Sequence, residues 1–204
     1  MTPLVSCAYF PPVAWVAAVL PYDHVWIEVK ETFPKQTFRN RVEIMTAEGV
    51  RTLSVPTLRS NHTPTDEVGI DYSTRWPMIH LRTLRAAYAA SPYFLYYCDD
   101  LEAILSARYD TLVDLDMATC RWLLDKLKVE CNLMTTTDFA VAAPLDWRNR
   151  FTPKSPLPAN LFPSYYQVFA DRQPFAPNLS ALDLLMNLGP DSGGYLRSLS
   201  LKWT

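Results

Sequence analysis

Prolines and glycines are distributed unusually along this chain, and their distribution restricts the folds it can adopt. The 204 residues contain 17 prolines but only 5 glycines, whereas average usage would give roughly 10 and 14. Five of the prolines fall in 144–163, which has almost no hydrophobic periodicity, so we predict an extended, surface-tracking segment there. The glycines form neither G-x-G-x-x-G nor G-x-x-x-x-G-K-S/T, so the sequence supports neither a typical dinucleotide-binding fold nor a P-loop NTPase.

The remaining composition is that of a globular protein with a sizeable core. Apolar residues make up 49% of the chain, charged residues make up 20%, and the formal net charge is −2. This balance gives no electrostatic footprint for nucleic acid or for an anionic membrane surface. The longest apolar run, 13–20, is far shorter than the ~20 residues that span a bilayer. We therefore predict one soluble, cytoplasmic domain over 1–204, with neither nucleic acid nor membrane as a partner.

The N-terminal part of the chain predicts a parallel unit followed by a hairpin. Apolar and β-branched runs indicate strands at 4–8, 24–29, 38–45 and 50–55, with a short helix over 13–20. A strand, a helix and a second strand in this order are typical of a βαβ unit. We predict a four-residue hairpin loop at 46–49, where Gly49 is available for a positive φ.

The rest of the chain alternates helical and strand patterns. We predict an exposed loop over 57–73, helices over 74–90, 93–107, 111–128 and 181–188, and strands at 130–134 and 165–169. The predicted fold is thus α/β, with a small mixed or mainly parallel sheet, an N-terminal βαβ unit, a hairpin, flanking helices and the proline-rich extended segment near the C-terminus. The strand and helices of 165–204 are expected to pack back on the core.

Helical periodicity places His80 at the centre of an apolar face. At 100° per residue, that face carries Trp76, His80, Leu84, Ala87 and Tyr88. A buried imidazole needs a hydrogen-bond partner, so His80 is either a satisfied core histidine or a catalytic residue. The histidines form no H-x-x-x-H or H-E-x-x-H pattern, and no cysteines cluster with them, so we predict neither a metal site nor a cofactor.

Arg39, Asn40 and Arg41 are candidates for anion recognition. If they lie in a strand, the two arginines share one face and Asn40 points to the other. The fork of donors on a guanidinium suits phosphate or carboxylate, and the diphosphate of a nucleotide sugar is the anion we expect there. The alternative is a solvated strand face without function.

Tyr9 and Phe10 follow the first predicted strand at its carboxyl end. Open α/β sheets bind their ligands at that edge, so this aromatic pair can stack on a sugar or a base. Alternatively, both rings cover the core. Ser6 and Cys7 end the same strand, but neither a nucleophile elbow nor a paired histidine accompanies them, and Cys7 is interpreted as an inert core thiol.

Asp183 lies in an apolar helix, where burial can raise its pKa and make it a general base. A structural interpretation competes, because Ser180 and Asp183 have the spacing of a helix capping box. Asn187 follows one helical turn later on the same face, where it can meet Asp183 or hold a loop of the tail. Gly189 and Pro190 are interpreted first as the end of the helix.

Several separated motifs carry a family resemblance when they are taken together. They are Tyr9-Phe10-Pro11; Phe38-Arg39-Asn40-Arg41; Trp76, His80-Leu81 and Tyr88 with Ser91-Pro92-Tyr93-Phe94; and Tyr166-Gln167-Val168-Phe169 with 177–185. The third set resembles the "W…HL…Y…APYF" helix and exit of the WbqC-like family of bacterial proteins. The order and spacing of all four motifs agree with that family.

The resemblance implies an α/β fold and a role in handling sugar precursors, because genes of this family often lie among those for surface polysaccharides such as the O-antigen. It strengthens a site role for His80, while Asp183 stays a catalytic candidate beside its interpretation as part of a helix cap. Tyr88 and Asn187 join Tyr9, Phe10, Arg39, Asn40 and Arg41 as substrate-binding candidates. Two functions follow as expectations. One is a transferase-like enzyme acting on a nucleotide sugar or polysaccharide precursor, and the other is a non-catalytic binding or scaffold protein that retains the fold.

The family resemblance also indicates a shortened branch. Longer relatives have a second α/β stretch before the tail, where this chain has its proline-rich segment. In the enzyme interpretation, Tyr9, Arg39, Asn40 and His80 are expected near one pocket with a small-molecule ligand.

Overall fold

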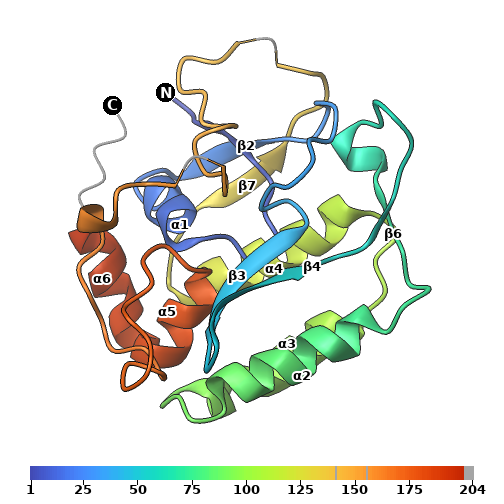
Figure 1. Ribbon diagram of the computed structural model, residues 1–204. Helices are drawn as coiled ribbons and strands as arrows, with labels where there is room; N and C mark the ends of the chain where they lie inside the picture. Colours follow the sequence, from blue (N-terminus) through green and yellow to red (C-terminus); the bar gives the residue numbers. More distant parts are fainter. Residues whose placement is uncertain (141, 155, 200–204) are drawn as a thin grey trace.

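A three-stranded parallel sheet organises the fold. The computed structural model describes residues 1–140, 142–154 and 156–199 (Figure 1). Strands β1 (Leu4–Ser6), β2 (His24–Glu28) and β7 (Asn132–Thr135) pair in the order β1-β2-β7, and both pairings are parallel. Helix α1 (Val13–Val19) connects β1 to β2. The predicted parallel βαβ unit is thereby confirmed, and so is the strand predicted at 130–134.

Alternation along the strands decides which face of the sheet meets the core. Val5, Val25 and Ile27 are fully buried on one face. Leu4 and Trp26 are paired in register on the opposite face, where Trp26 keeps 39% of its surface exposed. Because successive side chains point to opposite sides of a strand, the sheet has one face in the core and one outer face.

The proline-rich segment borders the sheet instead of only tracking the surface. Asp146 forms a parallel bridge with Leu4, whose N–H donates to Leu145 O (2.9 Å) and whose carbonyl accepts from Trp147 N (2.8 Å). Trp147 and Phe162 are both buried at 4% exposure. A short 3-10 helix, η2 (Ala159–Leu161), lies further along the segment. Most described residues of the segment are exposed or partly exposed, as expected, and Trp147 and Phe162 fix it against the core.

The hairpin of β3 (Arg41–Thr46) and β4 (Gly49–Ser54) has a tighter turn than expected. Thr46 pairs with Gly49, so the loop holds two residues instead of four, and Gly49 adopts the expected positive φ of +106°. The region 57–73 contains small elements in place of a plain loop. These are β5 (Thr57–Leu58), the 3-10 helix η1 (Thr65–Glu67) and β6 (Gly69–Ile70).

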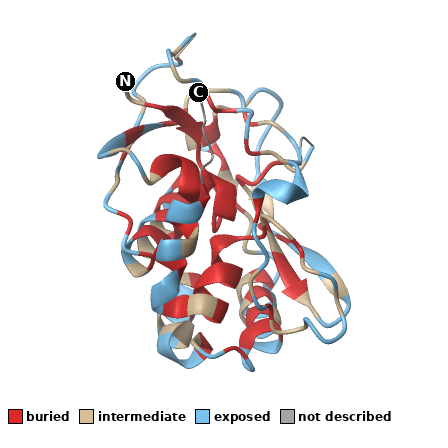
Figure 2. Ribbon diagram, turned by 90° about the vertical axis from the view of Figure 1, so that its left-hand side faces the viewer, coloured by how far each residue is buried: buried red, intermediate tan, exposed pale blue. Residues whose placement is uncertain are grey.

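Three long helices follow the hairpin and its small neighbouring elements along the chain. They are α2 (Trp76–Tyr88), α3 (Phe94–Ser106) and α4 (Leu112–Lys126). The buried residues of α2 are the five that its periodicity predicted. Figure 2 shows buried residues concentrated in the interior and exposed residues in the outer loops and on parts of the helices. Within the described residues, no helix has the length and apolarity needed to cross a membrane.

The tail returns to the N-terminal part of the chain. Ser180 donates its N–H to Glu43 O (2.9 Å) and its hydroxyl to Phe10 O (2.9 Å), just before α5 (Ala181–Leu188). The chain ends its described part with the 3-10 helix η3 (Gly189–Asp191) and α6 (Ser192–Ser198). Residues 200–204 of the predicted C-terminal unit lie outside the described residues.

The strand predicted over 165–169 is wrong, because this stretch has no strand pairing and turns at its end. Gln167 explains the difference. Its side-chain amide donates to Ala176 O (3.0 Å) and accepts from Ala176 N (3.0 Å). A side chain thus makes to the backbone the pair of hydrogen bonds that a neighbouring strand would supply.

We predict that Gly189→Ala destabilises the protein by about 2 kcal/mol or more in urea unfolding. Gly189 has a φ of +52°, and a Cβ built there would lie 2.5 Å from the ring of Tyr93. The control is Gly194→Ala, because a Cβ at Gly194 meets nothing within 4 Å and alanine favours the helix by up to about 1 kcal/mol. Equal effects of the two substitutions would contradict the prediction.

Candidate functional site

Polar side chains gather where the parallel strands end. Ser6 ends β1 and is paired in register with Glu28, which ends β2. The hydroxyl of Thr136, directly after β7, donates to the Glu28 carboxylate (2.9 Å). The three side chains form a polar row across the outer face, one step beyond Leu4 and Trp26. Ligands of open α/β sheets bind at this carboxyl edge.

Arg148 covers the polar row from the segment that borders β1. Its guanidinium donates to Ala140 O (2.7 Å), forms an ion pair with Glu28 (3.5 Å), and grips both carboxylate oxygens of Asp146. The main-chain carbonyl of Arg148 accepts a hydrogen bond from the Ser6 hydroxyl (2.6 Å). Arg148 is only 8% exposed. Glu28 and Asp146 balance its charge inside the protein.

A second buried arginine approaches the same serine. Arg39 donates to the Ser6 hydroxyl (2.6 Å), pairs with the carboxylate of Glu31, and keeps 2% of its surface exposed. The expected strand geometry is corrected here, since Arg39 and Asn40 lie in the turn before β3. Arg39 is therefore buried in an ion pair, and it is not part of a solvated strand face.

The other two members of this motif have different surroundings. The Asn40 amide donates to Val55 O (3.0 Å) and holds the turn against the end of the hairpin. Arg41 is the first residue of β3 and is partly buried. Burial raises the pKa of the Glu43 carboxyl, and the nearby charge of Arg41 lowers it.

A small cavity lies between the two buried arginines. Its volume is about 10 Å³, which is near the minimum for one water molecule. Besides Ser6 and the arginines, the cavity is lined by aromatic rings: Trp15, Phe38, Trp147 and Phe151. Aromatic faces beside guanidinium groups are the chemistry that binds a phosphorylated sugar or nucleoside.

A buried acid lies behind the cavity. Asp116 of α4 is fully buried, and neither carboxylate oxygen accepts a hydrogen bond from a nitrogen or hydroxyl donor of the described residues. Burial raises its pKa well above the usual value, opposed by the Cys7 thiol and the charge of Arg39. Cys7 lines the cavity, and burial followed by the charge of Asp116 raises its pKa well above that of a free thiol. The thiol is therefore not activated as a nucleophile.

His80 and Tyr9 form a separate buried pair. Tyr9 Oη lies 3.0 Å from His80 Nδ1, and both side chains are at most 3% exposed. The ring centroid of His80 is 5.0 Å from that of Trp76. Burial lowers the pKa of His80 to about 4, although a hydrogen bond with the backbone of Ser54 raises it. Phe10 packs beside Tyr9 with ring centroids 4.8 Å apart.

Asp183 lies in a third cluster with Tyr88. Its carboxylate accepts hydrogen bonds from the hydroxyls of Tyr88 (3.1 Å) and Tyr165 (2.6 Å) and from the amide of Gln167 (2.9 Å). Burial raises the pKa of Asp183, and these three donors lower it. The cluster joins α2, the stretch before α5, and α5 itself.

The capping box suggested for Ser180 and Asp183 is not formed. The Ser180 hydroxyl caps the helix by accepting from Leu182 N (3.2 Å), but the Asp183 carboxylate is engaged by the cluster described above. Asn187 does meet Asp183, through a bond from its amide to the main-chain carbonyl (2.8 Å).

The predicted site residues therefore do not share one pocket. Tyr9, Phe10 and His80 form one cluster, and Tyr88, Asp183 and Asn187 form another. Of the remaining three, only Arg39 lines the cavity at the carboxyl edge. Sequence reasoning missed Glu28, Glu31, Asp116 and Arg148. Their one sequence signal is position, since Glu28 lies near the end of a predicted strand and Arg148 near the start of the proline-rich segment. No three His, Cys, Asp or Glu side chains in the described part of the chain gather so that they could hold a metal ion.

We predict that His80 makes stability depend on pH. Its pKa of about 4 in the folded protein lies below the unfolded value near 6.5. The contribution of neutral His80 is therefore full above pH 6.5 and is lost as the pH falls toward 4, by about 3 kcal/mol in all. Urea unfolding of wild type and His80→Gln between pH 7 and 4 measures this difference. A stability difference that does not change with pH would contradict it.

Asp116 is predicted to act in the opposite direction. Because its folded pKa lies above the unfolded value, the contribution of the protonated acid is full below about pH 3.9 and is lost as the pH rises through the folded pKa. Relative to wild type, Asp116→Asn should thus become more stable as the pH rises from 4 to 8. Parallel stability curves for the two proteins would refute the assignment.

Comparison with known protein families identifies the family of this chain. Residues 7–150 match the WbqC-like protein family, a span that contains Arg39, Asp116 and Arg148. An uncharacterized protein of Mycobacterium tuberculosis (strain ATCC 25618 / H37Rv) is 25% identical over 218 aligned residues, which cover 93% of this chain and 91% of that protein. No solved structure matches the chain. Since the family match extends over more than half of its length, the chain belongs to the WbqC-like protein family.

Proposed function

We propose that this chain binds a nucleotide sugar or a related surface-polysaccharide precursor at the carboxyl ends of β1 and β2 and acts on it as a cytoplasmic, transferase-like enzyme. The observation that carries the proposal is that the buried Arg39 and Arg148 line one cavity at the end of β1. The Arg39 guanidinium donates to the Ser6 hydroxyl, which in turn donates to the main-chain carbonyl of Arg148. Two guanidinium groups at the edge of a parallel sheet fit a diphosphate.

The carboxylates around the arginines support this interpretation. Glu31 pairs with Arg39, while Glu28 and Asp146 pair with Arg148. These carboxylates compensate the charges of the two arginines, whose burial without a partner would cost several kcal/mol of stability. Phosphate oxygens can replace these carboxylate oxygens without leaving either guanidinium unpaired, so the arginines exchange partners when the ligand binds.

The aromatic lining and the buried acid complete the proposed site. The cavity holds about 10 Å³, and in this proposal Trp147 and Arg148 move outward with the segment that carries them to admit the sugar. Asp116 lies behind Cys7 of the cavity lining, and burial favours its protonated form. We assign it as the candidate source of the proton that the diphosphate oxygen takes up when its bond to the sugar breaks, while an acceptor hydroxyl bonds to the sugar and gives up its own proton. The Tyr9–His80 pair and the Tyr88–Asp183 cluster hold the scaffold in this proposal.

Binding is predicted to raise the melting temperature and to depend on both arginines. Titration calorimetry and thermal shift with UDP-glucose, GDP-mannose and dTDP-glucose should reveal a ligand. Arg39→Lys and Arg148→Lys keep the charge but lose the fork of donors, so each should weaken binding at least tenfold. Arg172→Lys is the control, because Arg172 is exposed and pairs only with the adjacent Asp171 among the described residues.

Consumption of the bound nucleotide sugar separates the two functional classes. A transferase-like enzyme consumes it slowly even with water as the acceptor, whereas a binding or scaffold protein returns it unchanged. Absence of any binding by the wild-type protein would overturn the proposal. Equal binding by Arg172→Lys and the two buried-arginine variants would overturn the placement of the site.

A further inference from the structure

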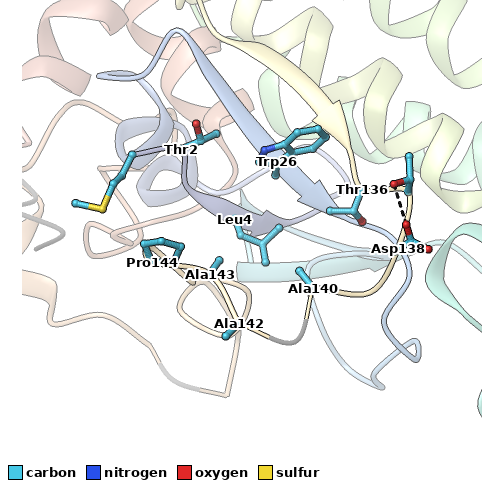
Figure 3. Close-up of a pocket in the computed structure, with 11 residues that line it drawn as sticks. Thr2, Leu4, Trp26, Thr136, Asp138, Ala140, Ala142, Ala143 and Pro144 are labelled. Atoms are coloured by element: carbon cyan, nitrogen blue, oxygen red, sulfur yellow. Dashed lines mark hydrogen bonds between the residues drawn. The ribbon is translucent and has the colours of Figure 1, made fainter.

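An open groove lies on the outer face of the sheet, near the small cavity between the two buried arginines. Its volume is about 450 Å³, within the range of small-molecule sites. Leu4 and Trp26 form the strand side, and lining residues within 136–140 and 142–144 form the other (Figure 3). Asp138 and Pro144 lie at opposite ends of the groove in this view.

The lining of the groove is apolar along most of its length and polar at one end. Ala140, Ala142, Ala143 and Pro144 offer small apolar surfaces, and Trp26 keeps 39% of its surface exposed beside them. The polar end carries Thr136, Thr137 and Asp138, and the Thr137 hydroxyl donates to the Asp138 carboxylate (3.2 Å). A flat ring with two apolar faces and an N–H at its edge matches this pattern. A hexose needs more hydrogen-bond partners than the alanines provide.

The groove and the buried Arg148 share neighbouring residues. Thr136 and Ala140 both line the groove, and both donate to the Glu28 carboxylate, at 2.9 and 3.0 Å. The carbonyl of Ala140 accepts from Arg148 at 2.7 Å. Trp26 and Glu28 lie two residues apart on one strand face, so the groove and the polar row are about 7 Å apart.

We infer that the groove is the nucleobase subsite of the ligand whose diphosphate the arginines bind. The base lies against Trp26 with an edge N–H directed to Asp138, and the phosphates point to Arg148. The sugar that is processed then enters the aromatic cavity beside Arg39. This inference rests on the proposed function and specifies its ligand as a nucleoside diphosphate derivative.

The probes that test this subsite are nucleoside diphosphates (UDP, GDP, ADP, CDP and dTDP), with inorganic pyrophosphate as the ligand that lacks a base. Stacking of a base on an aromatic ring contributes about 1–3 kcal/mol, so Trp26→Ala should raise the Kd of the preferred nucleotide at least fivefold. Its affinity for pyrophosphate should stay within twofold of wild type. Trp26→Phe keeps an aromatic face and should restore most of the nucleotide affinity.

Tyr96→Ala is the matched control, since it removes an aromatic side chain that is 77% exposed on α3 and lines neither cavity. Nucleotide binding that is unchanged in Trp26→Ala, while both buried-arginine variants weaken it, would overturn the nucleobase subsite and leave the proposed function standing. Failure of wild type to bind any nucleotide or pyrophosphate would overturn the proposed function, and the subsite with it.

Discussion

The carboxylate of Glu28 is the point at which distant segments of this protein are fastened to the sheet. It is fully buried at the end of β2, yet it accepts hydrogen bonds from Lys30 N (2.8 Å), Thr136 Oγ1 and Ala140 N, and it pairs with Arg148. A buried carboxylate without such partners would cost several kcal/mol. The carboxylate therefore ties the segments on both sides of the sheet edge to the end of β2. The path of the proline-rich segment follows from these bonds.

The same constraint explains how charge is distributed at the carboxyl edge. Ser6 receives Arg39 on one side and contacts the backbone of Arg148 on the other. Glu31 and Asp146 then neutralise the two guanidinium groups. An apolar set of the same volume would often be at least as stable as such a network. A protein that keeps paired charges at the edge where α/β sheets bind ligands keeps groups that can exchange partners with an anion.

Sequence patterns predicted the parts of this fold that depend on local periodicity. The buried face of α2 and the cap at Ser180 follow from residues within or beside one helix, and the parallel βαβ unit follows from three consecutive elements. The boundaries of β3 could not be predicted, because Arg39 leaves the strand pattern to reach Glu31. The stretch 165–169 failed for a similar reason, since Gln167 bonds to Ala176 through its side chain.

The candidate site was harder to predict than the fold because its members meet only through tertiary structure. Glu28, Asp116 and Arg148 are separated by many residues, and each alone resembles an ordinary charged residue in its element. His80 and Asp183 attracted attention because a polar residue interrupts an apolar helix face, a pattern that indicates burial but does not distinguish chemistry from structural hydrogen bonding.

The hydrogen-bond partners distinguish the buried groups that the sequence could not. The oxygens of Asp183 accept from three donors, so its carboxylate has little capacity left for a substrate. Asp116 is equally buried, but its oxygens accept no bond from a nitrogen or hydroxyl donor of the described residues. A buried acid with open hydrogen-bonding capacity beside a cavity is able to take part in proton transfer, whereas a fully satisfied one is suited to hold elements together. Of the two acids in the helices packed around the core, Asp116 is therefore the stronger candidate for chemistry.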